Sequence, residues 1–103
     1  MRRRIRGLVD DPAAVMLAHL RAHQARALAR GIPAYANYFC RPADRLQLTG
    51  ELVVKRWQLP PELAGAAGGR SEWVRFTAGT LEPVQPVWES DGATRRIIGW
   101  QSI

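Results

Sequence analysis

The chain has 103 residues, of which 47% are hydrophobic and 23% charged, a balance typical of a globular domain that argues against disorder. Its net charge of +6 is concentrated at one end, because residues 1–30 carry seven arginines and two aspartates while the rest is nearly neutral. This asymmetry indicates a surface for an acidic partner. The single Cys40 excludes an internal disulfide and a cysteine-rich zinc site, and it favours a reducing compartment.

We interpret residues 1–103 as one small domain in which residues 1–10 form a basic arm or an edge strand. The arm carries Arg2, Arg3, Arg4 and Arg6. Asp10 and Asp11 stand where a secretion signal would have its apolar region, and no apolar run approaches the ~20 residues of a membrane span. We therefore expect a cytoplasmic protein that makes no membrane contact.

Residues 11–30 predict an α-helix, with Asp11 as N-cap, Pro12 at the first helical position and Gly31 just past the end. Spacing of about 100° per residue divides this helix into three faces. The face expected in the core comprises Ala13, Met16, Leu17, Leu20, Gln24, Ala27 and Leu28. A second face, almost without bulk, comprises Ala14, Ala18, Ala22, Ala25 and Ala29. The third is basic or titratable and comprises His19, His23, Arg26 and Arg30. We expect the alanine face to lie on the chain's own sheet, with a partner's helix as the alternative.

The rest of the chain predicts an antiparallel meander with strands at 45–58, 71–78, 82–90 and 94–102, after a short helical turn at 34–39. The predicted fold class is therefore α+β, with one long N-terminal helix packed on three to four strands. Segment 45–59 has two interpretations. Alternation of Leu46, Leu48 and Leu52 favours a strand, whereas Thr49 also suits the start of a short capped helix.

Asp91-Gly92 predicts a tight hairpin turn, which would place Trp88 opposite Arg95 so that the two side chains stack. Pro83 and Pro86 confine the strand at 82–90 to an edge or a bulge, since proline cannot donate to a ladder.

No catalytic or metal motif stands out. His19 and His23 have the i, i+4 spacing of a metal pair, but no third ligand has motif spacing to them, so we expect no metal and no cofactor. Cys40 lacks a companion base and is expected to be a buried apolar thiol. The carboxylates are scattered, and we predict that the protein is not an enzyme.

The basic residues favour nucleic-acid binding through phosphate contacts, with DNA favoured over RNA. The titratable helix face extends roughly 16 Å at 1.5 Å per residue. The predicted contacts are the arm, this helix face and the hairpin: Arg2, Arg3, Arg4, Arg6, His19, His23, Arg26, Arg30, Arg95 and Arg96. Single-stranded bases would find stacking partners in Trp57, Trp73, Trp88 and Trp100.

A different class of function is a protein-interaction or homodimerisation module that uses the alanine face or an exposed Pro83–Pro86 sheet edge. A third alternative is a small-ligand pocket between helix and sheet, lined by Trp and Tyr, which rests on the aromatic content alone.

Residues 48–59, Leu-Thr-Gly-Glu-Leu-Val-Val-Lys-Arg-Trp-Gln-Leu, resemble the first helix and turn of excisionase and MerR-type winged helices. Residues 73–81 resemble the end of their recognition helix with the strand that follows. This resemblance implies a winged-helix-like alternative fold. It also implies that DNA would contact Lys55, Arg70, Arg75, Arg95 and Arg96.

Overall fold

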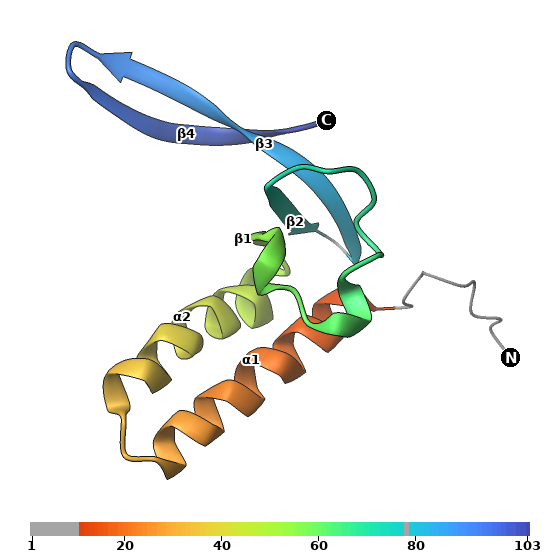
Figure 1. Ribbon diagram of the computed structural model, residues 1–103, viewed down its shortest axis with the longest axis vertical. Helices are drawn as coiled ribbons and strands as arrows, with labels where there is room; N and C mark the ends of the chain where they lie inside the picture. The colour runs from red at the N-terminus through yellow and green to blue at the C-terminus, as the bar shows by residue number, and fades with distance from the viewer. Residues whose placement is uncertain (1–10, 78) are drawn as a thin grey trace, which may run out of the picture.

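The computed structural model describes residues 11–77 and 79–103, and these form two helices and a four-stranded antiparallel sheet (Figure 1). The predicted α+β fold class is confirmed. The predicted arm at residues 1–10 lies outside the described residues. Within the described ranges, neither helix combines the length and the apolar character needed to cross a membrane.

The first helix, α1, spans Pro12–Ala29 and confirms the predicted element with its ends. The Asp11 carboxylate accepts a hydrogen bond from the Ala14 N–H at 3.1 Å, which satisfies one of the free donors of the first turn. Gly31 adopts a φ of +69° directly after the helix, a conformation that glycine reaches without steric cost.

A second helix, α2, spans Pro33–Thr49, where only a short turn at 34–39 was predicted. Pro42 lies inside it, lacks the N–H that would bond back to Tyr38, and costs about 3 kcal/mol relative to alanine. The helix continues because Ala36, Ala43 and Leu46 fall on one face and are buried. Burial of this face, at about 0.8 kcal/mol for each methyl or methylene, offsets the proline.

The two helices form an antiparallel hairpin, and this pairing overturns the expected position of the alanine face. Met16 and Leu20 of α1 pack in one core with Ala43 and Leu46 of α2, whereas Leu28 is 58% exposed. The alanine face points away from the core, and all five of its members are exposed: Ala14, Ala18, Ala22, Ala25 and Ala29. It therefore covers neither the sheet nor α2.

The sheet is a simple meander of β1 (Leu52–Lys55), β2 (Trp73–Thr77), β3 (Thr80–Asp91) and β4 (Thr94–Ser102), with neighbours in chain order. Two 3₁₀ turns, η1 (Arg56–Gln58) and η2 (Pro61–Leu63), follow β1. The predicted strand at 45–58 is correct only at 52–55. Leu46 is buried and Leu48 is 84% exposed, because residues two apart point in different directions on a helix but in the same direction on a strand.

The winged-helix alternative is wrong for the same part of the chain. Residues 48–59 contain the end of α2, then β1 and η1, instead of a helix and turn. Residues 64–72, where a recognition helix would lie, form no α-helix.

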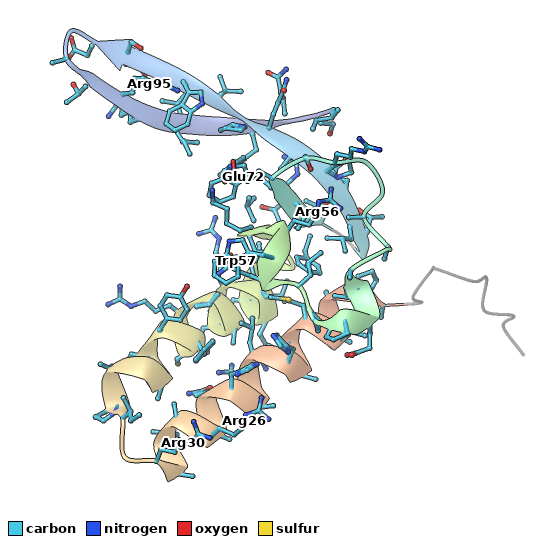
Figure 2. The ribbon with its side chains drawn as sticks, in the orientation of Figure 1. Arg26, Arg30, Arg56, Trp57, Glu72 and Arg95 are labelled. Atoms are coloured by element: carbon cyan, nitrogen blue, oxygen red, sulfur yellow. The ribbon has the colours of Figure 1, made fainter. Side chains whose placement is uncertain are left out.

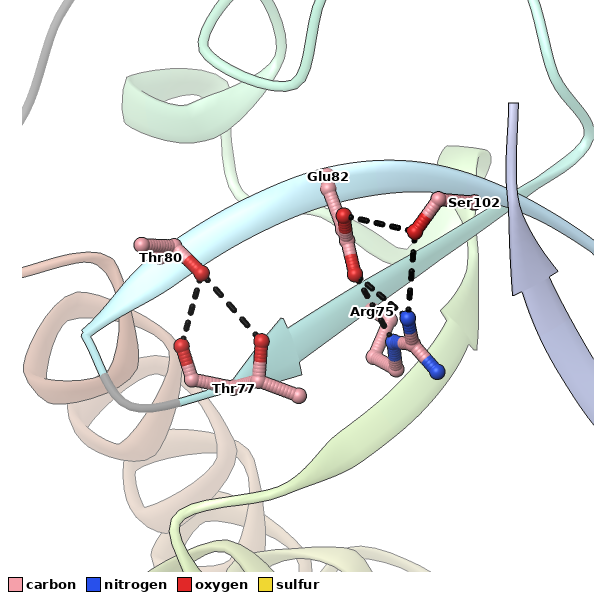
Figure 3. Close-up of polar contacts among 5 residues, drawn as sticks. All are labelled: Arg75, Thr77, Thr80, Glu82 and Ser102. Atoms are coloured by element: carbon pink, nitrogen blue, oxygen red, sulfur yellow. Dashed lines mark hydrogen bonds and ion pairs between the residues drawn. The ribbon is translucent and has the colours of Figure 1, made fainter.

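One face of the sheet packs on the helices and the other is held by polar contacts. Leu52, Val54, Val74 and Phe76 are buried in the core. On the opposite face, Arg75 donates to Glu82 at 2.6 Å and to Ser102 at 3.3 Å, while Ser102 donates to Glu82 (Figure 3). The same bonds, with Arg75 contributing most, lower the pKa of Glu82. They tie β2, β3 and β4 together.

Beyond β2, the strands β3 and β4 continue as a two-stranded ribbon that projects away from the helices (Figure 1). The prolines predicted an edge or a bulge. β3 is not an edge strand of the sheet, since it lies between β2 and β4, but its pairing with β4 has a register shift between Val87 and Trp88, close to Pro86. Pro86 is tolerated because it faces the side of β3 on which β2 has ended, beyond the Trp73–Val84 pair. Pro83 lies level with the end of β4, where its carbonyl accepts from Ile103.

The ribbon turns at Gly92-Ala93, not at Asp91-Gly92, because Asp91 pairs with Thr94. Trp88 therefore lies opposite Ile97, and Arg95 is its diagonal neighbour on the same face. The predicted stacking is confirmed despite the shifted register, with the guanidinium carbon of Arg95 4.3 Å from the Trp88 ring centroid.

Candidate functional site

An apolar groove of about 810 Å³ runs between the two helices and the segment β1–η1. This volume lies within the range of small-ligand sites. The residues that line it come from all three elements: Met16, His19, Leu20, His23, Ala34, Tyr38, Phe39, Pro42, Leu52, Val53, Val54, Trp57, Gln58, Leu59, Pro60 and Pro61. We call this site the aromatic groove.

Histidine rings form part of the wall of the groove. His23 stacks on Phe39 with ring centroids 5.1 Å apart, and His19 meets His23 edge-on at 4.5 Å. Burial lowers the pKa of His23, and the nearby charges of His19 and Arg26 lower it further. The His23 ring therefore favours its neutral form, although the sequence placed this residue with the phosphate contacts.

The other wall is formed by η1, which presents Trp57 to solvent with 77% of its surface exposed (Figure 2). Pro60 ends this short turn, since the residue before a proline avoids the helical conformation. Gln58 bridges the walls. Its side-chain oxygen accepts from the Lys55 N–H at 2.8 Å, and its Nε2 donates to the Tyr38 hydroxyl at 3.3 Å.

The lining of the groove carries no acidic side chain, since none of the described residues that line it is a carboxylate. Arg26 and Arg30 continue the His19–His23 face of α1 towards its C-terminal end, where Figure 2 shows both side chains. Both are exposed, and neither has a carboxylate partner among residues 11–77 and 79–103. Two guanidinium groups without carboxylate partners among these residues thus follow the groove residues along the same face of α1.

The opposite side of the helical hairpin is neutralised. Arg21 donates to Asp44 and Gln47, each at 2.8 Å, and Cys40 donates from Sγ to Asp44 at 3.3 Å. Chiefly through the Arg21 bond, these contacts lower the pKa of Asp44. The expectation of a buried apolar thiol is wrong, because Cys40 is half-buried and hydrogen-bonded to a carboxylate.

Arg95 and Arg96 were predicted to act together, but they lie on opposite faces of the ribbon. Arg95 stacks on Trp88, which is 46% exposed, whereas Arg96 pairs with Glu89 at 3.4 Å. The predicted DNA contacts therefore fall into separate places. His19, His23, Arg26 and Arg30 lie along one face of α1, and Arg95 and Arg96 lie far along the ribbon.

Arg56 has a structural role that the sequence did not reveal. Its side chain donates to the Ser71 carbonyl at 2.7 Å, the Gly68 carbonyl at 2.8 Å and the Ser71 hydroxyl at 3.1 Å. It anchors the loop of residues 64–72 behind η1. In the described part of the chain, no group of three or more histidine, cysteine or carboxylate side chains is placed to hold a metal ion.

Sequence reasoning expected tryptophan and tyrosine in a pocket without naming Tyr38, and it missed Phe39 and Gln58 as groove residues. The signal was the cluster Tyr35-Ala-Asn-Tyr-Phe39 directly after the first helix, but with 34–39 read as an isolated turn it had no helical face to join. Comparisons with protein-family models, curated proteins and solved structures found no match to this chain.

Proposed function

We propose that the protein is a non-enzymatic nucleic-acid-binding protein that takes an unpaired base into the aromatic groove and contacts the adjoining phosphates through Arg26 and Arg30. The observation that carries the proposal concerns the described residues: the groove is rich in aromatic rings and has no lining carboxylate, and two arginines without carboxylate partners follow it along α1. Proteins that bind single strands combine stacking rings with a basic track in this manner.

The polar groups of the groove are also suited to hydrogen-bond a nucleic-acid base. The Tyr38 hydroxyl and the Gln58 amide lie on its rim, and the two histidines add ring nitrogens to one wall. A flat base gains stacking from the exposed Trp57 ring while these groups offer hydrogen bonds. A duplex would have to release a base to make the same contacts, so we expect single strands to bind more tightly.

The test is fluorescence anisotropy with labelled single- and double-stranded oligonucleotides across a salt series. The double variant Arg26→Ala/Arg30→Ala is compared with Arg41→Ala/Arg70→Ala, which removes the same charge from exposed positions outside the groove. We expect the first pair to lower the slope of log affinity against log salt by about 0.7 for each lost contact, and the second to change it little. Equal effects of both pairs would show non-specific attraction and refute the proposed site.

The protein-interaction alternative keeps one specific observation in its favour. The ribbon of β3 and β4 exposes Ile98 and Ile103, and the outer edge of β4 pairs with no other strand among the described residues. Two-stranded ribbons are only marginally stable in water, and a partner strand on β4 would extend the sheet. A concentration-dependent mass in sedimentation equilibrium that is lost on Ile98→Lys would support this second function.

A further inference from the structure

The face of the sheet turned away from the helices carries three of the four tryptophans. Trp73 lies opposite Lys55 on β1 and Val84 on β3, and Trp100 lies opposite Pro86. Trp88 follows Val84 and Pro86 at alternating positions along β3, so it shares their face. We call Trp73, Trp88 and Trp100 the tryptophan face.

The rings on this face contact one another and nearby cations. Trp73 and Trp100 have ring centroids 4.8 Å apart, and the Lys55 ammonium lies 4.1 Å from the Trp73 centroid. Val84, the cross-strand partner of Trp73, is 1% exposed. Trp88 belongs to no such buried cluster. It remains 46% exposed, with the Arg95 guanidinium over its ring.

The cations of this face differ in how far they are neutralised. Lys55 pairs with Glu72, and Arg75 pairs with Glu82. Arg95 has no carboxylate partner among the described residues, so its charge is available to a phosphate while its plane extends the Trp88 stack. An exposed tryptophan beside a free arginine is the pairing that single-strand sites use.

The aromatic groove and the tryptophan face meet at β1. Val53 lines the groove and lies opposite Arg75 on the outer face, and Lys55 stands two residues before Trp57. Figure 2 shows Trp57, Glu72 and Arg95 in succession from the helices towards the tip of the ribbon. A chain that leaves the groove beside β1 therefore reaches the tryptophan face without crossing the core.

We propose that the tryptophan face is a second binding site for the same single strand, with Trp88 and Arg95 stacking and neutralising nucleotides that extend beyond the groove. This inference rests on the proposed function of the groove. It assigns unequal roles to the two adjacent arginines of the ribbon. Arg95 lies on the tryptophan face and would contact the bound strand, whereas Arg96 lies on the opposite face and would not.

The test compares two homopolymeric single strands of about 4 and about 16 nucleotides, the limits of site size for compact single-strand folds. Anisotropy is measured for Arg95→Ala, for its matched control Arg96→Ala, and for Trp88→Ala with Trp88→Phe as the variant that retains a ring. We expect Arg95→Ala and Trp88→Ala to weaken binding of the long strand at least about fivefold, equivalent to one lost stack. Binding of the short strand should not change, and Arg96→Ala should leave both strands unaffected.

The inference is overturned if Arg95→Ala and Arg96→Ala weaken the long strand equally, or if neither Trp88 variant differs from the parent. Failure of the proposed function gives a different pattern, in which the short strand does not bind and Trp57→Ala has no effect on either strand. Circular dichroism of each variant checks that the ribbon is folded. If Trp88→Ala does not fold, the ring-retaining variant Trp88→Phe is compared with the parent in its place.

Discussion

Replacement of Trp57 by alanine separates the proposed base site from the stability of the fold. The ring is 77% exposed, so only about a quarter of its surface contacts the protein. For a side chain of about 200 Å², that quarter contributes about 1 kcal/mol to stability at 25 cal/mol per Å². Loss of one stacked base costs about 1–3 kcal/mol in binding, which is a weakening of about 5- to 150-fold.

The assay is anisotropy with the short single strand at fixed salt, together with urea denaturation of the same samples. Leu48→Ala is the matched control, because Leu48 is 84% exposed on α2 and lies outside the groove. We expect it to leave the affinity unchanged. A folded Trp57→Ala variant that binds within twofold of the parent would refute the reasoning, since an exposed ring at the groove would then contribute nothing to recognition.

Three further predictions concern the fold around the site. Because folding lowers the pKa of His23, the unfolded chain binds the proton more readily than the folded chain. The free energy of unfolding should therefore keep the full contribution of His23 above the ordinary histidine pKa of about 6.5 and decrease as the pH is lowered from there. Urea midpoints on either side of that pH should differ less in His23→Phe, and an equal difference would contradict the assignment. Ala22→Glu should change the unfolding free energy by less than about 0.5 kcal/mol, because the alanine face is exposed; a large loss would mean that this face is packed. Arg56→Ala should cost about 1–3 kcal/mol by removing the anchor of residues 64–72, and Arg56→Lys should not restore it; full stability of either variant, measured by urea denaturation, would contradict this role.

Capping residues and the alternation of side chains along the sequence predicted the first helix and three of the four strands. The cap at Asp11 and the glycine at Gly31 fixed both ends of α1, and alternation located β2, β3 and β4 to within a few residues. The Trp88–Arg95 contact was predicted even though the turn lies one residue further on, because a diagonal pair on one face is also within reach.

The second helix was missed because its evidence is tertiary. Pro42 reads locally as a helix terminator, and only burial of Ala43 and Leu46 against α1 explains why the helix continues. The aromatic groove depends on that helix, since Tyr38 and Phe39 supply one of its walls. The same pairing of α1 with α2 left the alanine face exposed and placed His19 and His23 at the groove. Residue spacing shows which side chains share a face of one helix, but it does not show which face a second helix will cover.

The most direct test of the central claim follows the tryptophan indole N–H signals in ¹H–¹⁵N correlation spectra as the short single strand is added. Assignment comes from the Trp57→Ala and Trp88→Phe variants. If a base enters the aromatic groove, the Trp57 indole signal shifts most and saturates with the binding curve, while the Trp88 signal stays in place. A Trp57 signal that does not move while the oligonucleotide binds would contradict the account.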